Sequence, residues 1–466
     1  MGSSLNKHIC GCLGSREHGP GQAPVLALPA GAQAKAVQSH LVLHFDVNKT
    51  IVMVDTIQGI PVGDVLNGIL AECAWGRPVE ANGDLARGWQ LTWPEALPVR
   101  PPESPDLMSF LEYLEERLPG KAKDMKKKRE EVWKKFTEHG QPGEALRPVY
   151  EKLQAALLVE GRMVGTKMVI PSFFKLVADL VKKGRSFSIV FRTFGSDLQV
   201  VQAEFNLFCS GQHPQYPDIR LDGSVAGLPD LRIGPENTGS WYRDTDNLSI
   251  VWGTTTLEED LKAAGGDLDQ FLAAPANAGL KASCGLAAVL QDLTSKTAKP
   301  CVMGLRDYFP YWHKGGQHGP FGKPLLVDTG DTRRHNIFFD DNILLDDQDT
   351  KIVDVRDKCG RALWPVYAQR YYICRSEPLF ALSDDRYFIR KVEEFEAVFH
   401  RKRIALKRLR AASLLVTSMI RAGRQVALSP EASQSDYDAW KQPRLSLLKM
   451  HVSASTATVG DEGRED

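Results

Sequence analysis

The sequence has few cysteines, no long apolar run and no apolar signal at its start. Eight cysteines in 466 residues are too few for a disulfide scaffold, and the one close pair, Cys10 and Cys12, lacks the spacing of a zinc knuckle or a redox pair. No apolar stretch approaches the roughly 20 residues that cross a bilayer, and the first residues lack the apolar centre of a secretory signal. These absences predict a cytoplasmic protein.

The sequence also lacks an excess of charge of either sign. Its 58 Lys and Arg residues balance 58 Asp and Glu residues, so the formal net charge is zero. That balance argues against bulk binding of nucleic acid through charge. The hydrophobic fraction of 43% and the charged fraction of 25% are ordinary for globular proteins and allow a sizeable core. The length predicts two or three modules, or one core with a large insertion.

Residues 1–40 are rich in Gly, Ala, Ser and Pro and are predicted to form a flexible leader. Within them, Gly2 with Cys10 and Cys12 nearby indicates dual acylation. Acylation would hold the chain at a membrane surface as a peripheral protein, because two acyl chains anchor where one does not. An unmodified leader is the alternative, since Asn6 stands where the acylation signal prefers Ser or Thr.

Near the other end, apolar residues recur at three- to four-residue intervals and predict a long helix over 386–427. Its segment 401–410 is strongly basic. A solvated helix face packed on the core is one interpretation of this segment, and contact with a partner, a lipid or a nucleic acid is the other. Residues 428–466 are polar and are predicted to be disordered.

Several short apolar runs have the composition of buried strands and alternate with helical patterns. They are residues 41–45, 187–191, 248–252, 301–305 and 336–339. Strands that are apolar on both faces favour a parallel sheet covered by helices, with sites at the carboxyl ends of the strands. The sequence therefore predicts an α/β fold with a Rossmann-like, three-layer core and a mostly parallel sheet.

Three of the predicted strands end in polar residues, and two lysines precede the last of them. In chain order these polar residues are Asp46, Thr193, Lys314, Lys323, Asp340 and Asp341. Their order and context resemble the motifs of the haloacid dehalogenase superfamily: a strand-terminal aspartate in a D-x-x-x-T loop, a strand-terminal Ser or Thr, a lysine and an acidic pair. The resemblance covers the motifs and the strands that carry them. It implies a Mg²⁺-dependent phosphohydrolase that acts on a small phosphate ester through an aspartyl-phosphate intermediate, with a cap over the active site.

The chemistry of these residue types agrees with that resemblance. A carboxylate such as Asp46 that attacks phosphorus divides one hard displacement into two easier ones. Because carboxylate and phosphate repel each other, the site needs a cation, and Mg²⁺ prefers hard oxygen ligands. Asp46, the carbonyl of Asn48, and Asp340 or Asp341 are the expected ligands.

The remaining roles fall to a cation, a hydroxyl and an outer carboxylate. Lys323, in the turn Gly322-Lys323-Pro324, is expected to neutralise the nucleophile and the phosphoryl group, and Lys314 is the alternative. Thr193 is expected to hold phosphoryl oxygens, and Asp346 to orient the metal ligands.

Each of these residues alone also fits a structural role. A single Asp or Thr at a strand end is usually a turn or cap residue, and a single lysine is usually solvated. The adjacent pair Asp340 and Asp341 fits that interpretation less well, because two like charges close together are costly unless a cation joins them.

One position departs from the superfamily pattern. Its phosphatases usually carry a second Asp two residues after the nucleophile, where it protonates the leaving group, and this sequence has Asn48. Loss of a general acid and base costs about 10²–10⁴ in rate. Three interpretations follow: a slow phosphatase, a family member with different chemistry, or a regulatory protein that binds phosphate or metal without turnover.

The spacing of the motifs predicts two insertions. The positions of Asp46 and Thr193 differ by 147 residues, and those of Thr193 and Asp340 by another 147, far more than a crossover needs. We therefore expect the first strand and nucleophile loop at 41–57, a helical cap at 58–170, and the core at 171–385 with an irregular insertion around 210–247.

Within the cap, Ser104 followed by Pro105 predicts the start of a helix that runs to Leu118. The basic stretch 121–136 is either a solvated helix or a surface that meets an anionic substrate.

Overall fold

The computed structural model describes six stretches of the chain. They are residues 38–53, 61–81, 83–120, 122–159, 162–163 and 169–421. The expectations for most of the leader, including Gly2, Cys10 and Cys12, and for the C-terminal tail lie outside these residues.

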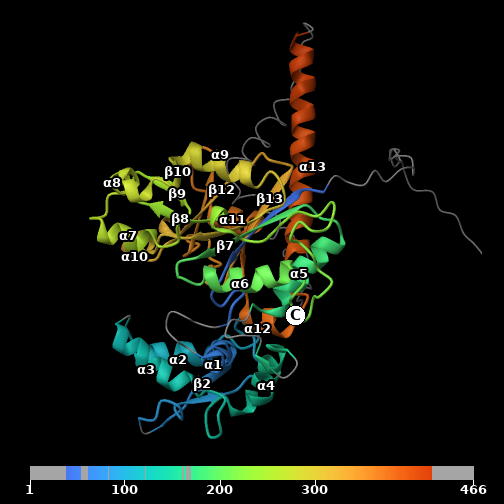
Figure 1. Ribbon diagram of the computed structural model, residues 1–466. Helices are drawn as coiled ribbons and strands as arrows, with labels where there is room; N and C mark the ends of the chain where they lie inside the picture. Colours follow the sequence, from blue (N-terminus) through green and yellow to red (C-terminus); the bar gives the residue numbers. More distant parts are fainter. Residues whose placement is uncertain are drawn as a thin grey trace, which may run out of the picture. The chain divides into compact units, whose positions relative to one another are not determined.

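The fold is mixed α/β and is built on an eight-stranded sheet in the order β10-β9-β8-β11-β7-β1-β13-β15 (Figure 1). The pairs from β8 through β15 in this order are parallel, and β9 runs antiparallel to both of its neighbours. A mostly parallel sheet is thus confirmed. The strands are β1 (His40–Asp46), β7 (Phe187–Thr193), β8 (Thr238–Arg243), β9 (Leu248–Trp252), β10 (Lys281–Cys284), β11 (Val302–Arg306), β13 (Arg334–Asp340) and β15 (Ile373–Arg375).

Both faces of the sheet are covered, which explains why its central strands are continuous apolar runs. On one face, Phe45 stacks on Phe339 with ring centroids 4.7 Å apart and meets Phe173 of α5 edge-on at 5.1 Å. On the other face, Val42 and Val190 belong to a cluster that includes α9. The covering helices are α5 (Pro171–Lys182), α6 (Leu198–Cys209), α9 (Leu286–Lys296) and α13 (Tyr387–Arg421).

The long C-terminal helix is present as α13 from Tyr387 to Arg421, and residues 422–427 of the predicted helix lie outside the described residues. Among the described residues, no helix is both long enough and apolar enough to cross a membrane. The shorter helices are α7 (Leu257–Ala263), α8 (Leu268–Ala273), α10 (Phe309–Lys314), α11 (Pro365–Tyr371) and α12 (Pro378–Ser383).

A second, two-stranded parallel sheet pairs β12 (Lys323–Val327) with β14 (Val353–Asp357). Its residues Leu325 and Val355 pack in one cluster with Phe338 of β13. The sequence placed Lys323 in a turn, and this was wrong, because Lys323 is the first residue of β12.

The described residues between β1 and β7, which correspond to the predicted cap and are called the cap below, form four helices before α5. They are α1 (Val62–Cys73), α2 (Phe110–Arg117), α3 (Lys123–Trp133) and α4 (Arg147–Ala156). Two small antiparallel sheets that the sequence did not predict lie in the same segment: β2 (Trp75–Pro78), β3 (Trp89–Leu91) and β4 (Met108–Ser109), and β5 (Leu158–Val159) with β6 (Arg162–Met163).

Helix α2 begins later than predicted. Its N-cap is Ser109, whose hydroxyl accepts from the backbone N–H of Glu112 while the Glu112 carboxylate accepts from Ser109. This reciprocal capping box satisfies two backbone donors, and nothing comparable holds a helix at Ser104.

The predicted irregular insertion around 210–247 extends less far than expected. A short 3₁₀ turn at Pro235–Asn237 ends it, and β8 follows at Thr238–Arg243. The prediction was therefore wrong for β8, which lies between β9 and β11 in the main sheet. Other single 3₁₀ turns lie at Glu144–Leu146, Pro275–Asn277 and Gly319–Phe321.

Candidate active site

Three carboxylates meet at the carboxyl edge of the main sheet. Oxygen atoms of Asp46, Asp340 and Asp341 all lie within 4.8 Å of one another. The register of the parallel strands β1 and β13 produces this meeting, because Phe45 lies opposite Phe339 and the next residue of each strand is an aspartate. Asp46 and Asp340 are buried, and Asp341 is half-buried.

A lysine from the second sheet lies against this acidic cluster. The Nζ atom of Lys323 donates to Oδ1 of Asp46 and, at 2.8 Å, to Oδ2 of Asp340, and its side chain is 1% exposed. Lys314, the other predicted lysine, is an exposed residue at the end of α10. Of the two candidates, the structure therefore brings only Lys323 to the carboxylates.

The cluster contains more carboxyl groups than ammonium groups. With all three carboxyl groups ionised, it would have a formal excess of two negative charges in a buried place. Burial raises the pKa of Asp46 well above its usual range, Lys323 opposes this, and Asp340 adds to it. Burial, followed by the charge of Asp340, raises the pKa of Asp341 to about 7. A divalent cation would offset this excess, and three hard oxygen donors are the ligands that Mg²⁺ prefers.

Lys323 stays charged in this environment. Burial lowers its pKa, but the carboxylates of Asp340 and Asp46 outweigh burial and raise that pKa above its ordinary value. Its ammonium group also lies 5.1 Å from the centre of the Phe194 ring. Lys323 thus holds a positive charge against the carboxylate of Asp46.

Thr50 links the two aspartate-bearing loops, and the sequence analysis did not assign it a role. Its hydroxyl donates to Oδ2 of Asp46 at 3.2 Å and accepts from the backbone N–H of Asp341 at 3.1 Å. The loop turns back through Lys49, whose φ of 58° is unusual for a residue other than glycine. The threonine of the D-x-x-x-T pattern was the signal that could have identified this role.

Thr193 lies at the same edge but does not hydrogen-bond to the carboxylates. It ends β7, beside Arg192, which is opposite Asp46 in the register of β1 and β7. Its hydroxyl accepts from the backbone N–H of Gly195 at 2.9 Å. The hydroxyl therefore holds the loop after β7 in place, one strand away from Asp46.

A buried arginine joins three segments below the cluster, and the sequence analysis missed it. Arg192 donates to both carboxylate oxygens of Asp307, and to the carbonyl of Pro324 at 3.1 Å. Burial raises the pKa of Asp307, and Arg192 opposes that shift. Because Pro324 follows Lys323, the hydrogen bond from Arg192 to the Pro324 carbonyl holds the start of β12 against the main sheet. An arginine within the apolar run before Thr193 was the only signal in the sequence.

Asn48, the position that departs from the superfamily pattern, bonds to a second carboxylate. Its Nδ2 atom donates to Oδ2 of Asp197 at 2.8 Å, and its Oδ1 atom is buried without a hydrogen-bond partner. Asp197 immediately precedes α6, but its side chain makes no capping bond to that helix and accepts from Asn48.

The Asp346 carboxylate hydrogen-bonds within its own loop and makes no hydrogen bond with the acidic cluster. It is exposed, and its Oδ1 atom accepts from the backbone N–H of Gln348 at 2.6 Å, as in an ordinary turn. The expectation that Asp346 orients the metal ligands was therefore wrong.

A cavity of about 400 Å³ lies between the acidic edge and the cap. Asn48, Lys49 and Asp341 line it on one side, and helices α2 and α3 line it on the other. Its volume is within the range of small-molecule sites. The cap residues that line it are Val65, Gly68, Leu111, Glu115, Lys126, Arg129, Glu130 and Trp133.

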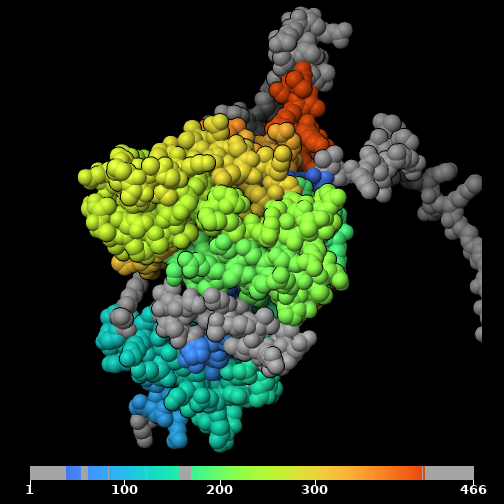
Figure 2. Space-filling model, in the orientation of Figure 1, coloured from blue at the N-terminus to red at the C-terminus, as the bar shows by residue number. Residues whose placement is uncertain are grey.

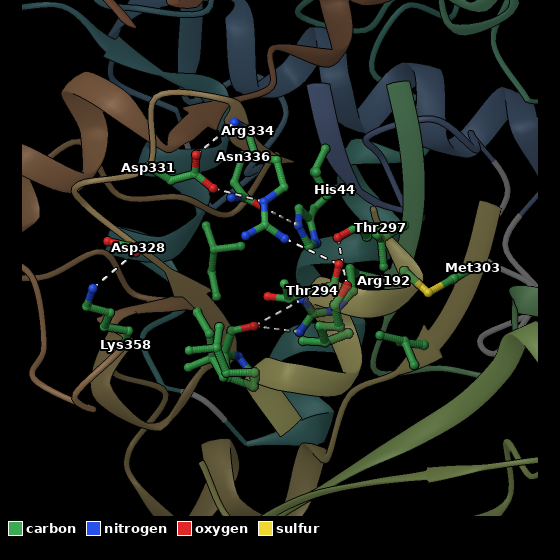
Figure 3. Close-up of a pocket in the computed structure, with 18 of the residues that line it drawn as sticks. His44, Arg192, Thr294, Thr297, Met303, Asp328, Asp331, Arg334, Asn336 and Lys358 are labelled. Carbon is green, nitrogen blue, oxygen red and sulfur yellow. Dashed lines mark hydrogen bonds and ion pairs between the residues drawn. The ribbon is translucent and has the colours of Figure 1, made fainter. Parts of the chain in front are cut away.

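A second cavity, of about 130 Å³, lies beside β1 and β7, lined by His44, Arg192 and Asn336 among others (Figure 3). Its charged rim is neutralised in pairs: Arg334 with Asp331 at 2.9 Å, and Lys358 with Asp328 at 3.2 Å. The three carboxylates of the acidic cluster do not line this cavity.

Comparison of the chain with protein-family models, with curated proteins and with solved structures found no match in any of the three. The geometry of the acidic cluster and of the cavity above it is therefore the basis for the function.

Proposed function

We propose that the chain is a phosphohydrolase of the haloacid dehalogenase type that hydrolyses a small phosphate ester with the help of Mg²⁺. The observation that carries the proposal is the acidic cluster with its lysine: Asp46, Asp340, Asp341 and Lys323 gathered at the carboxyl edge of a parallel sheet. That edge is where α/β folds bind their ligands. The main sheet would then be the centre of a Rossmann-like, three-layer core.

In the first step, a carboxylate oxygen of Asp46 attacks phosphorus and the ester oxygen departs with its bonding electrons. An aspartyl-phosphate forms, and water then attacks its phosphorus and releases inorganic phosphate and the free carboxylate. Mg²⁺ held by Asp46, Asp340, Asp341 and the carbonyl of Asn48 would offset the repulsion between carboxylate and phosphate.

Several other residues support this step without taking part in bond making. Lys323 keeps a positive charge against Asp46, and Thr50 aims one carboxylate oxygen by donating to the other. Thr193 and the backbone after β7 would meet the phosphoryl oxygens from the neighbouring strand.

The cavity above the acidic cluster supports a small substrate. Lys49, Lys126 and Arg129 place three positive side chains around it, and Trp133 adds a flat apolar surface. Three acidic side chains, Glu115, Glu130 and Asp341, also line it. The lysine-rich helix of the cap thus lines the proposed substrate site.

Asn48 cannot protonate a leaving group or activate water, so both steps lack their usual acid and base. A second candidate function therefore stands beside the first: a regulatory protein that binds phosphate or metal with little turnover. The bond from Asn48 to Asp197 favours it, because this contact ties the amide to the protein.

Turnover of an aryl phosphate with Mg²⁺ tests the proposal, because an aryl leaving group needs little protonation. We expect slow turnover by the wild type, none by Asp46→Asn, and faster turnover by Asn48→Asp. Because the new carboxylate of Asn48→Asp would face the Asp197 carboxylate, the exchanged pair Asn48→Asp with Asp197→Asn restores a hydrogen bond between the two positions. An increase in turnover rate of about 10²-fold or more in either variant would show that the wild type is slow because it lacks a general acid and base.

Equal rates in the wild type and Asp46→Asn would overturn the enzymatic proposal. If the wild type binds Mg²⁺ and inorganic phosphate but none of the variants turns over, the regulatory function is the better account.

A further inference from the structure

The second half of α13 carries positive charge that the fold uses only in part, because Lys402 donates to the Tyr372 hydroxyl and Arg410 to the carbonyl of Gly330. Residues 401–410 include six Lys and Arg residues, and no Asp or Glu occurs between Glu396 and Glu431. Arg401, Lys407 and Arg408 are exposed, and within the described residues none of them has a hydrogen bond or an ion pair.

Contacts along α13 show which edge of the sheet it reaches. Near its start, Phe388 packs edge-on against Phe45 at 5.2 Å, close to the acidic edge. Farther along, Phe399 stacks on His335 at 4.1 Å, and His335 lies opposite Leu41 near the amino end of β1. The helix therefore runs from the acidic edge of the sheet to the opposite, amino edge.

Comparison of the lengths of β1 and α13 shows where the helix extends past the sheet. From Phe45 to Leu41 a strand covers about 13 Å, and from Phe388 to Phe399 a helix covers about 16 Å, so the two advance together. Beyond Phe399 only one more residue of β1 remains, whereas residues 400–421 extend about 33 Å. The basic segment begins where the helix passes the edge of the sheet, and Figures 1 and 2 show the orange-red part of α13 beyond the body of the fold.

The projecting helix exposes apolar side chains as well. Leu409 is 62% exposed and Leu414 is 71% exposed. Arg401, Ile404 and Arg408 follow one another at helical spacing and share an exposed face, so cations and an aliphatic group lie side by side.

We propose that residues 401–414 of α13 dock on a membrane surface that carries anionic lipid. Unpaired cations gain from the surface charge of such a membrane, and exposed leucines gain by entering its apolar boundary. A nucleic acid would satisfy the cations but would leave Leu409 and Leu414 in water, so the lipid surface is the better match.

The orientation of the fold is consistent with this docking. Arg410 donates to the carbonyl of Gly330 at 2.7 Å, and the backbone N–H of His40 donates to the carbonyl of Arg333 in the same loop at 2.7 Å. The first residue of β1 therefore lies at the same edge of the sheet as the basic segment. The acidic cluster lies at the other end of β1.

Sedimentation of the full-length protein with lipid vesicles tests this proposal independently of any enzymatic activity. The vesicles contain phosphatidylcholine alone or with added phosphatidylserine. We expect binding only when phosphatidylserine is present, and loss of that binding at high salt. The triple variant R401Q/K407Q/R408Q should bind about 100-fold more weakly, since each cation near an anionic surface contributes to affinity.

A matched control removes the same charge elsewhere. Lys127, Lys128 and Lys135 of the cap are exposed and basic, so K127Q/K128Q/K135Q should bind as the wild type does. The variant L409S/L414S should also bind more weakly, with its charge unchanged.

Equal binding to both kinds of vesicle would overturn the proposal. So would wild-type binding by a folded α13 triple variant, with folding checked by its circular dichroism spectrum. A loss of vesicle binding in the cap control as large as that in the α13 triple variant would also overturn it. Tighter binding to duplex DNA or RNA than to the anionic vesicles would also contradict it, because the segment would then be a nucleic-acid surface.

Discussion

Substitution of Lys323 by Met removes the ammonium group that bonds to both Asp46 and Asp340. The lysine is 1% exposed, so water cannot replace it without rearrangement. Removal of one partner from a buried ion pair costs about 3–5 kcal/mol, because the other charge stays buried and uncompensated. In Lys323→Met three carboxylates would remain together, and we expect a loss of about that size in the free energy of unfolding above neutral pH.

The pH dependence of this loss has a definite sign. Without the lysine, which opposes both shifts, the pKa values of Asp46 and Asp341 in the folded state rise farther above those of the unfolded chain. The folded variant then binds protons more tightly than the unfolded one, so its free energy of unfolding falls as pH rises, by up to about 1.4 kcal/mol per pH unit for each proton. The loss should be small near pH 4 and largest near pH 8. Mg²⁺ should recover part of it, about 2.7 kcal/mol at a hundred times its dissociation constant.

Urea denaturation followed by tryptophan fluorescence, with EDTA or with Mg²⁺, measures these differences. Lys314→Met is the matched control, because Lys314 is exposed and should change the free energy of unfolding by less than about 0.5 kcal/mol. The reasoning is refuted if Lys323→Met is as stable as Lys314→Met near pH 8, or if its instability does not respond to Mg²⁺.

Two further predictions concern Thr50 and Glu204. Thr50→Val should weaken Mg²⁺ binding by about 10- to 100-fold, because the Thr50 hydroxyl orients Asp46 and bonds to the backbone of Asp341. Thr50→Ser keeps the hydroxyl and should retain the affinity for Mg²⁺. Calorimetric titration measures both affinities, and equal values for the two variants would contradict the prediction. Burial raises the pKa of Glu204 to about 8, although its carboxylate accepts from Val169 at 3.0 Å, so the folded state favours the protonated form. The free energy of unfolding should therefore fall as the pH rises from about 4 to about 8, and Glu204→Gln should remove this fall. The control Glu138→Gln, at an exposed position, should keep the fall. An unchanged pH profile in Glu204→Gln would show that Glu204 is ionised in the folded state.

Local composition was enough to predict the central strands and the polar residues at their ends. Residues 41–45 and 336–339 are short, continuous apolar runs, and such runs form strands that are buried on both faces. The aspartates after them meet because the strands are parallel neighbours in register. The prediction that these distant segments form one site therefore depended only on the assumption that the strands are parallel.

Other features depend on partners that local sequence does not reveal. Arg192 and Asp307 are separated by 115 positions, and only the fold shows that they pair. The sequence did not decide between Lys314 and Lys323. Only the fold shows that Lys323, at the start of β12, contacts the acidic cluster. Strand β8 was missed because Pro235 and Gly239 interrupt any regular period around it.

The strands of the cap were missed for a simpler reason. β2, β3 and β4 have two to four residues each, too few to show an alternation of apolar and polar positions. They form through pairing with one another, which no single strand indicates.

The central claim is that Asp46 becomes phosphorylated, and acid quenching after mixing with an aryl phosphate that carries radioactive phosphorus tests it most directly. Since Asn48 cannot activate water, the phosphorylated form should accumulate. The account predicts a hydroxylamine-sensitive label on the peptide that contains Asp46, which is absent from Asp46→Asn and reduced in Asn48→Asp. Turnover by the wild type without label on that peptide, or label retained in Asp46→Asn, would contradict it.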